Sequence, residues 1–137
     1  MAGVVTLPVS SPMLYADARF EIITATRDTS AATSNVSYTG LGFTPKAILA
    51  FGSRAGTVAN AIGFAENTGT AETTEWYSSG GAGFYSIGTN LLILIEAGGV
   101  NYTNIAVASY DTDGFTATIT KAGSPTGTAD LSFACFR

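Results

Sequence analysis

Apolar and polar residues alternate along most of the chain in short runs, which are separated by glycine-rich or Ser/Thr-rich breaks. Alternation with a period of two places successive side chains on opposite faces of a β-strand. The three-and-four spacing of an amphipathic helix is hard to find. The pattern predicts strands at Phe20–Arg27, Asn35–Tyr38, Lys46–Ser53, Ala59–Glu66, Glu72–Ser78, Gly83–Ile87, Leu91–Glu96, Thr103–Tyr110, Phe115–Lys121 and Ala129–Phe136.

Eight to ten short strands in 137 residues indicate an all-β fold. The expected architecture is an antiparallel β-sandwich, with the jelly roll as the leading candidate. A chain of this length suits a single domain, which we place at residues 16–137. Residues 1–15 are expected to be an N-terminal arm or a flexible segment, because Pro8 and Pro12 disfavour a central strand.

Two aspartates one residue apart, Asp111 and Asp113, lie in the stretch SYDTDGFTATIT. An EF-hand calcium loop would need a glutamate twelve positions into the loop, and counting from Asp111 gives Ala122. Gly114 can take the backbone conformation that a tight turn requires. The stretch therefore predicts a hairpin whose two strands turn one set of side chains to the core: Ile105, Val107 and Ser109 before the turn, and Phe115, Ala117 and Ile119 after it.

The run Leu91, Leu92, Ile93, Leu94 and Ile95 is apolar throughout instead of alternating. Continuous apolar runs are typical of strands that are covered on both faces. The second face is covered either by another subunit or by other parts of the same chain, and the sequence leaves both explanations open.

Charge is sparse in this chain, and this excludes one class of function. Charged residues make up 12% of the sequence, with six basic residues against ten acidic ones and a net charge of −4. Nucleic-acid binding requires clustered cations, and none are clustered here. A surface with so little charge suits a protein that works in an assembly. The N-terminus lacks the features of a secretory signal, and no apolar run is long enough to span a membrane, which together favour a soluble product.

The residues for common catalytic chemistry are scarce. The chain has no histidine, which removes the most frequent general base and most zinc sites. The lone cysteine, Cys135, alternates with apolar residues and is expected to be a buried strand residue. Glu72 and Glu75 could pair with one of the hairpin aspartates as acid and base, although solvated surface glutamates are the simpler interpretation. We expect no cofactor, no metal site and no enzymatic activity.

Aromatic residues gather in the stretch EWYSSGGAGFY, which contains Trp76, Tyr77, Phe84 and Tyr85. These rings could complete the core, anchor a protein interface or contact a glycan. All three interpretations stay open, with core packing favoured.

Several motifs together resemble those of a group of small bacteriophage structural proteins. The matching residues are Gly42, Phe43, Pro45 and Lys46 in GLGFTPKAILAFGS, Ile62–Ala65 in AIGFAE, and Asp113–Thr116 in DGFT. The resemblance extends from about Thr39 to the end of the chain. The shared motifs are patterns of turns and strands. The resemblance therefore indicates the group of proteins more strongly than it indicates any particular function within the group.

The resemblance implies a virion protein made in the host cytoplasm. Its first interpretation is a capsid decoration (cement) protein on the outer shell, a homotrimer that binds the major capsid protein, without nucleic acid or membrane partners. Leu91, Leu92, Ile93, Leu94 and Ile95 would then form the subunit interface, and Trp76, Tyr77 and Tyr85 would contact the capsid or a ligand. The alternative is a tail-fibre or tail-tip module that binds host glycans. A carboxylate-based hydrolase ranks last.

Overall fold

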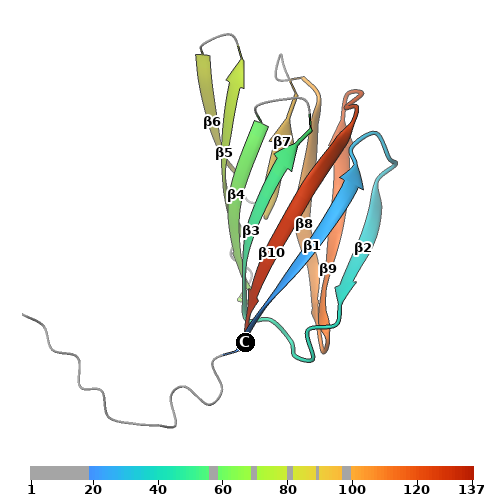
Figure 1. Cartoon of the computed structure of the whole chain (residues 1–137), viewed down its shortest axis with the longest axis vertical. Coiled ribbons are helices and arrows are strands. Elements are labelled where there is room, and N and C mark those ends of the chain that lie inside the picture. Colours follow the sequence, from blue (N-terminus) through green and yellow to red (C-terminus); the bar gives the residue numbers. More distant parts are fainter. Residues whose placement is uncertain (1–18, 56–58, 69–70, 80–81, 89, 97–99) are drawn as a thin grey trace, which may run out of the picture.

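The computed structural model describes residues 19–55, 59–68, 71–79, 82–88, 90–96 and 100–137, and for residues 59, 71–79 and 82–88 it describes the backbone alone. These residues form an all-β sandwich (Figure 1). Its strands are β1 (Phe20–Asp28), β2 (Ser34–Thr39), β3 (Ala47–Arg54), β4 (Ala59–Glu66), β5 (Ala71–Ser79), β6 (Ala82–Gly88), β7 (Leu92–Ile95), β8 (Tyr102–Asp111), β9 (Gly114–Ala122) and β10 (Thr128–Phe136). The predicted sandwich is confirmed, and each strand end lies within one residue of its predicted position. Nowhere in the described part of the chain is there a helix long and apolar enough to cross a membrane.

The strands form two antiparallel sheets that pack face to face. The larger sheet has the order β1-β10-β3-β4-β5-β6, and the smaller one has the order β2-β9-β8-β7. As in a jelly roll, β1 and β2 lie in different sheets and pair with the last two strands of the chain. Strands that follow one another in the sequence pair as hairpins, from β3 to β6 in the larger sheet and from β7 to β9 in the smaller one.

The first and last strands pair along their whole length. The register of β1 and β10 runs from Phe20 opposite Phe136 to Asp28 opposite Thr128. A further backbone hydrogen bond joins the Arg137 N–H to the Arg19 carbonyl at 2.9 Å. The described chain therefore enters and leaves the sandwich at the same end, side by side.

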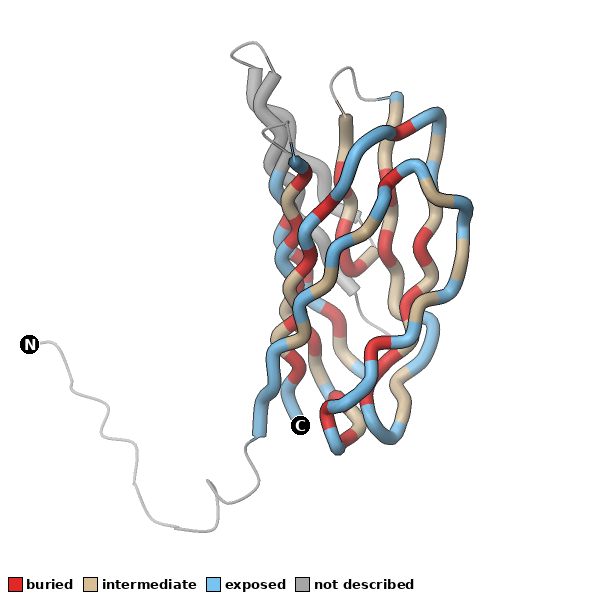
Figure 2. Tube along the Cα trace, turned by 45° about the vertical axis from the view of Figure 1, so that its right-hand side comes forward, coloured by how far each residue is buried: buried red, intermediate tan, exposed pale blue. Residues whose placement is uncertain are grey.

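Alternation along each strand directs one set of side chains into the space between the sheets, as the repeating burial in Figure 2 shows. Tyr38, Phe115 and Phe133 form an aromatic cluster there, with ring centroids 4.8 to 5.2 Å apart. Burying each of these side chains contributes on the order of 2 kcal/mol by area. Cys135 is fully buried beside this cluster, as its alternation predicted.

The apolar run at β7 is covered within the chain. Leu91, Leu92 and Leu94 have no exposed surface, whereas Ile93 and Ile95 are half-buried. Gly52 of the facing sheet allows this close packing, because a Cβ there would lie 3.2 to 3.3 Å from the methyl groups of Leu94 and Leu92. The three leucines therefore belong to the core of the chain itself, whereas the role of the run as a subunit interface stays a prediction, with Ile93 and Ile95 as its half-buried members.

The β8–β9 hairpin forms where the sequence predicted it, with Asp111 paired to Gly114 across the turn. One predicted core residue is displaced. An irregularity in the register between Val107 and Ser109 turns Ser109 out to solvent. Such a bulge changes which face the following side chains occupy.

Candidate functional site

The two hairpin aspartates have structural partners. The carboxylate of Asp113 accepts hydrogen bonds from the backbone N–H groups of Gly42 at 2.6 Å and Gly40 at 3.1 Å. Its own carbonyl accepts a third bond, from the Leu41 N–H. Gly40 and Gly42 have φ angles of 98° and 69°, a region that favours glycine. The GLGF and DGFT motifs therefore form one structural unit, a loop held by a carboxylate.

Asp111 acts within its own hairpin. Its carboxylate accepts hydrogen bonds from the hydroxyls of Ser109 at 2.9 Å and Thr116 at 2.8 Å. Glu72 and Glu75, the suggested catalytic partners, lie in β5 of the other sheet, and their side chains are outside the described residues. Among the described residues, no group of three or more His, Cys, Asp and Glu side chains is arranged to hold a metal ion.

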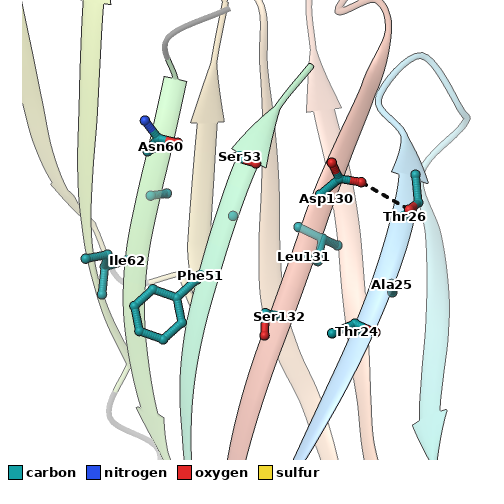
Figure 3. Close-up of a pocket in the computed structure, with 12 residues that line it drawn as sticks. Thr24, Ala25, Thr26, Phe51, Ser53, Asn60, Ile62, Asp130, Leu131 and Ser132 are labelled. Carbon is teal, nitrogen blue, oxygen red and sulfur yellow. Dashed lines mark hydrogen bonds between the residues drawn. The ribbon is translucent and has the colours of Figure 1, made fainter.

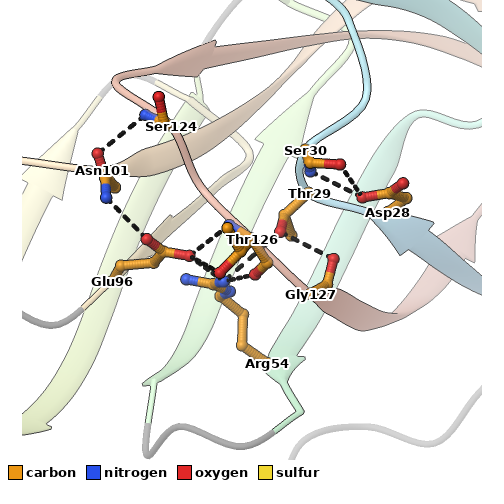
Figure 4. Close-up of polar contacts among 9 residues, drawn as sticks. All are labelled: Asp28, Thr29, Ser30, Arg54, Glu96, Asn101, Ser124, Thr126 and Gly127. Atoms are coloured by element: carbon orange, nitrogen blue, oxygen red, sulfur yellow. Dashed lines mark hydrogen bonds and ion pairs between the residues drawn. The ribbon is translucent and has the colours of Figure 1, made fainter.

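A buried ion pair joins the two sheets at one end of the sandwich (Figure 4). Arg54, at the end of β3, donates to Glu96, which follows β7, at 2.5 Å, and their side chains are 2% and 13% exposed. Arg54 also donates to the Thr126 carbonyl. Glu96 accepts further hydrogen bonds from the Thr126 N–H at 2.5 Å and from the Asn101 side chain at 2.9 Å.

This environment changes the acidity of Glu96. Burial opposes ionisation of the carboxyl group, but the hydrogen bonds from Thr126, Arg54 and Asn101 and the charge of Arg54 outweigh it. Together they lower the pKa of Glu96 to about 2. The carboxylate is ionised at neutral pH and is surrounded by donors from its own chain, which indicates a structural role.

The outward face of the larger sheet carries a groove of about 700 Å³ across β1, β10, β3 and β4 (Figure 3). One row across these strands contains Thr24, Ser132, Phe51 and Ile62, and the next contains Thr26, Asp130, Ser53 and Asn60. Phe51 and Ile62 are 43% and 51% exposed. Phe51 and Ile62 therefore form a short apolar strip, which Ser132 and Thr24 continue with hydroxyl groups, and the next row is a polar strip. Small-molecule sites commonly combine apolar and polar groups within 300 to 1,000 Å³.

The same face carries further exposed apolar side chains beyond the groove. We define the apolar patch as Phe20, Ile22, Phe51, Ile62, Phe64 and Phe136, which are between 37% and 59% exposed. At about 200 Å² for each fully exposed side chain, the patch exposes on the order of 500 Å². Patches of this size on single-chain proteins are often functional.

The predicted aromatic contacts lie in the same sheet. Trp76 and Tyr77 are in β5 and Tyr85 is in β6, with the backbone of Trp76 opposite Asn60 on one side and Tyr85 on the other. Their side chains lie outside the described residues, as does the predicted arm at residues 1–15. Their roles as contacts therefore stay predictions.

Sequence reasoning missed both the groove and the apolar patch. A signal was present, because alternation in LAFGS and AIGFAE places the large apolar residues on one face of each strand and only alanine and glycine on the other, which leaves the choice of buried face open. The predicted strands alone could not show that β1, β10, β3 and β4 are neighbours. Without that order, Phe51 and Asp130 could not be placed at one site.

The described residues thus form a β-sandwich with an open groove on the outward face of its larger sheet. No family model and no curated protein matches the chain. A solved structure that does match is a tailspike protein, gp49, from Acinetobacter baumannii bacteriophage Fri1, a capsular polysaccharide depolymerase. The match has 15% sequence identity and a TM-score of 0.41, and it covers 93% of this chain and 19% of the tailspike.

This comparison corrects one prediction. The sequence suggested that the protein is not an enzyme, whereas the matched structure is that of an enzyme. At this identity and TM-score, the likeness assigns neither an activity nor a substrate to this chain. The tailspike is a phage protein, as are the proteins in the sequence resemblance, but the GFxPK, IGFA and DGFT pattern gains no support from a family model.

Proposed function

We propose that this chain is a structural module of a bacteriophage particle that docks through the outward face of its larger sheet. The observation that carries the proposal is the apolar patch, which lies on a face that no part of the described chain covers. A stable protein interface typically buries about 800 Å² on each partner. The patch supplies on the order of 500 Å² of that area in apolar side chains alone.

The first specific role is that of a capsid decoration protein. In this role the patch meets the major capsid protein or a second copy within a homotrimer. A protein that binds only the assembled shell stabilises it by mass action, and many symmetric weak contacts combine through avidity. The low charge of the chain supports this role, because few charges have to be desolvated when such a surface is buried.

The test is the number of copies of this chain in each purified particle, measured by quantitative mass spectrometry. Hundreds of copies in a simple ratio to the major shell protein support decoration, because icosahedral symmetry fixes that ratio. A few copies place the chain in the tail, and its absence from particles overturns the proposal.

A pair of variants tests the docking surface itself. Ile22→Ser combined with Phe64→Ser should reduce incorporation into particles at least about tenfold, because it removes apolar area from the patch. Val100→Ser is the matched control, since Val100 is 72% exposed and lies outside the patch. Equal incorporation of both variants would contradict docking through this face.

A second role, receptor binding in the tail, is favoured by the groove. Its polar strip offers hydroxyl, amide and carboxylate groups beside an exposed ring, which is a combination that suits a glycan. Binding of purified protein to host cells, which excess cell-surface polysaccharide should prevent, tests this role.

A further inference from the structure

The groove on the larger sheet has two chemically distinct sides. Phe51 of β3 and Ile62 of β4 are opposite one another in the register and form its apolar side. Asp130, Ser53 and Asn60 come from β10, β3 and β4 and form a polar row beside them. Successive outward side chains of one strand are about 7 Å apart, so the two sides lie roughly the width of a sugar ring from each other.

The polar groups in this row can bind several hydroxyls at once. Asp130 is exposed and accepts one hydrogen bond, from the Thr26 hydroxyl at 3.1 Å. A carboxylate can accept about four hydrogen bonds, so Asp130 has acceptor sites left for a ligand. Asn60 is exposed and brings both a donor and an acceptor. A ligand with neighbouring hydroxyls on one edge matches this arrangement.

The apolar side of the groove indicates that the ligand also has an apolar face. An exposed ring and a branched aliphatic chain favour a ligand with a flat face of C–H groups. Pyranose sugars combine such a face with hydroxyls along the ring edge. A peptide would satisfy the apolar side, but it would leave most of the row of oxygen acceptors unused.

The charge of the groove distinguishes between neutral and acidic sugars as ligands. Among the described residues that line the groove, Asp130 is the one charged side chain, so no cation there can pair with an acidic sugar. Asp130 and the net charge of −4 repel an anion. We propose that the groove binds a neutral saccharide, with Phe51 and Ile62 against its C–H face and Asp130 and Asn60 bonded to its hydroxyls. This inference rests on the receptor-binding role proposed above.

The experiment measures binding of the purified full chain to immobilised neutral polysaccharides (mannan, galactan, dextran and chitin oligomers) and to the acidic polymers hyaluronate and polysialic acid. The expected result is binding to at least one neutral polymer and to neither acidic one. Phe51→Ala and Asp130→Asn should each weaken that binding about tenfold or more. Val100→Ala and Glu21→Gln are the matched controls, because both residues are exposed and lie outside the groove lining and the apolar patch.

Each outcome has a defined meaning. Loss of binding in the two groove variants with retention in the controls supports the proposal, provided that thermal melts show all four variants folded. Preference for an acidic polymer, equal binding by all variants, or no binding to any neutral polymer overturns it. The particle copy number is measured separately, so a chain that is present in particles but binds no saccharide refutes this inference and leaves the structural role intact.

Discussion

Replacing Glu96 by glutamine removes a charge from the ion pair that joins the two sheets and preserves the size of the side chain. Glutamine can still accept a hydrogen bond from Thr126, but it cannot balance the positive charge of Arg54. Arg54 is 2% exposed, so its guanidinium would be left buried without a counter-charge. The substitution therefore isolates the electrostatic contribution of the pair.

The size of the effect follows from the pKa of Glu96. Its fall from a reference value of 4.5 to about 2 corresponds to about 3 kcal/mol of folding stability at neutral pH, at 1.36 kcal/mol for each pKa unit. Breaking a buried ion pair typically costs about 3 to 5 kcal/mol, which agrees in order of magnitude. With a urea m-value of about 1 to 3 kcal/mol/M, the unfolding midpoint should fall by about 1 to 3 M.

The pH dependence gives a second, independent readout. A carboxyl group whose pKa is lowered by folding stabilises the protein fully above its unfolded pKa, and this stabilisation is lost as pH falls through the folded pKa. The difference in stability between wild type and Glu96→Gln should therefore be full at pH 7, decrease below about pH 4.5 and nearly vanish near pH 2. Urea titrations followed by tryptophan fluorescence at several pH values measure it.

The matched control is Glu21→Gln, because the Glu21 side chain is 48% exposed and its contact with Arg19 is a surface pair. Surface pairs contribute about 0 to 1 kcal/mol, so its midpoint should barely move. A Glu96→Gln midpoint within about 0.3 M of wild type at pH 7 would refute the reasoning, since it corresponds to less than about 1 kcal/mol. A stability difference that stays constant down to pH 2 would refute it as well.

Three further predictions concern the hairpin and the core. Asp113→Asn should lower the free energy of unfolding by about 1 to 3 kcal/mol, because it weakens the charge-assisted hydrogen bonds to the glycine loop. Thermal melts measure this, with Asp111→Asn as the comparison variant. The decrease should be larger for Asp113→Asn than for Asp111→Asn. Gly114→Ala should cost more than about 3 kcal/mol or prevent folding, because its Cβ would lie 1.9 Å from the Tyr38 carbonyl oxygen, and expression with circular dichroism checks this. Cys135 should react with iodoacetamide at pH 8 only after unfolding, because burial raises the pKa of its thiol to about 11; rapid labelling of the native protein would contradict this.

The strands were predictable because each depends on local alternation and ends at a glycine, proline or polar break. In β10, for example, Leu131, Phe133 and Cys135 alternate with exposed or half-buried residues in both the sequence pattern and the structure. The β8–β9 turn was predictable for the same reason, since Gly114 immediately follows the two aspartates. Ser109 was misplaced because a bulge shifts the alternation without changing the composition.

The long-range features were not predictable in this way. Arg54 and Glu96 are separated by 42 residues, and neither has a local pattern that marks it as buried. The apolar run at Leu91–Ile95 allowed either a partner or the chain's own core as its cover. Only the packing of the larger sheet against β7, with Gly52 facing the leucines, decides in favour of the core.

The pairing of the first strand with the last determines how the module responds to mechanical force. Because β1 begins at the end of the sandwich where β10 finishes, tension applied at Arg19 and Arg137 pulls the two strands apart from that end. The hydrogen bonds of the ladder are then loaded one after another, as in a zipper, instead of all together, as in shear. We therefore expect the sandwich to unfold at low force when it is pulled by residues 19 and 137, which leave the same end of the sandwich. It should resist higher force when the load does not separate β1 from β10.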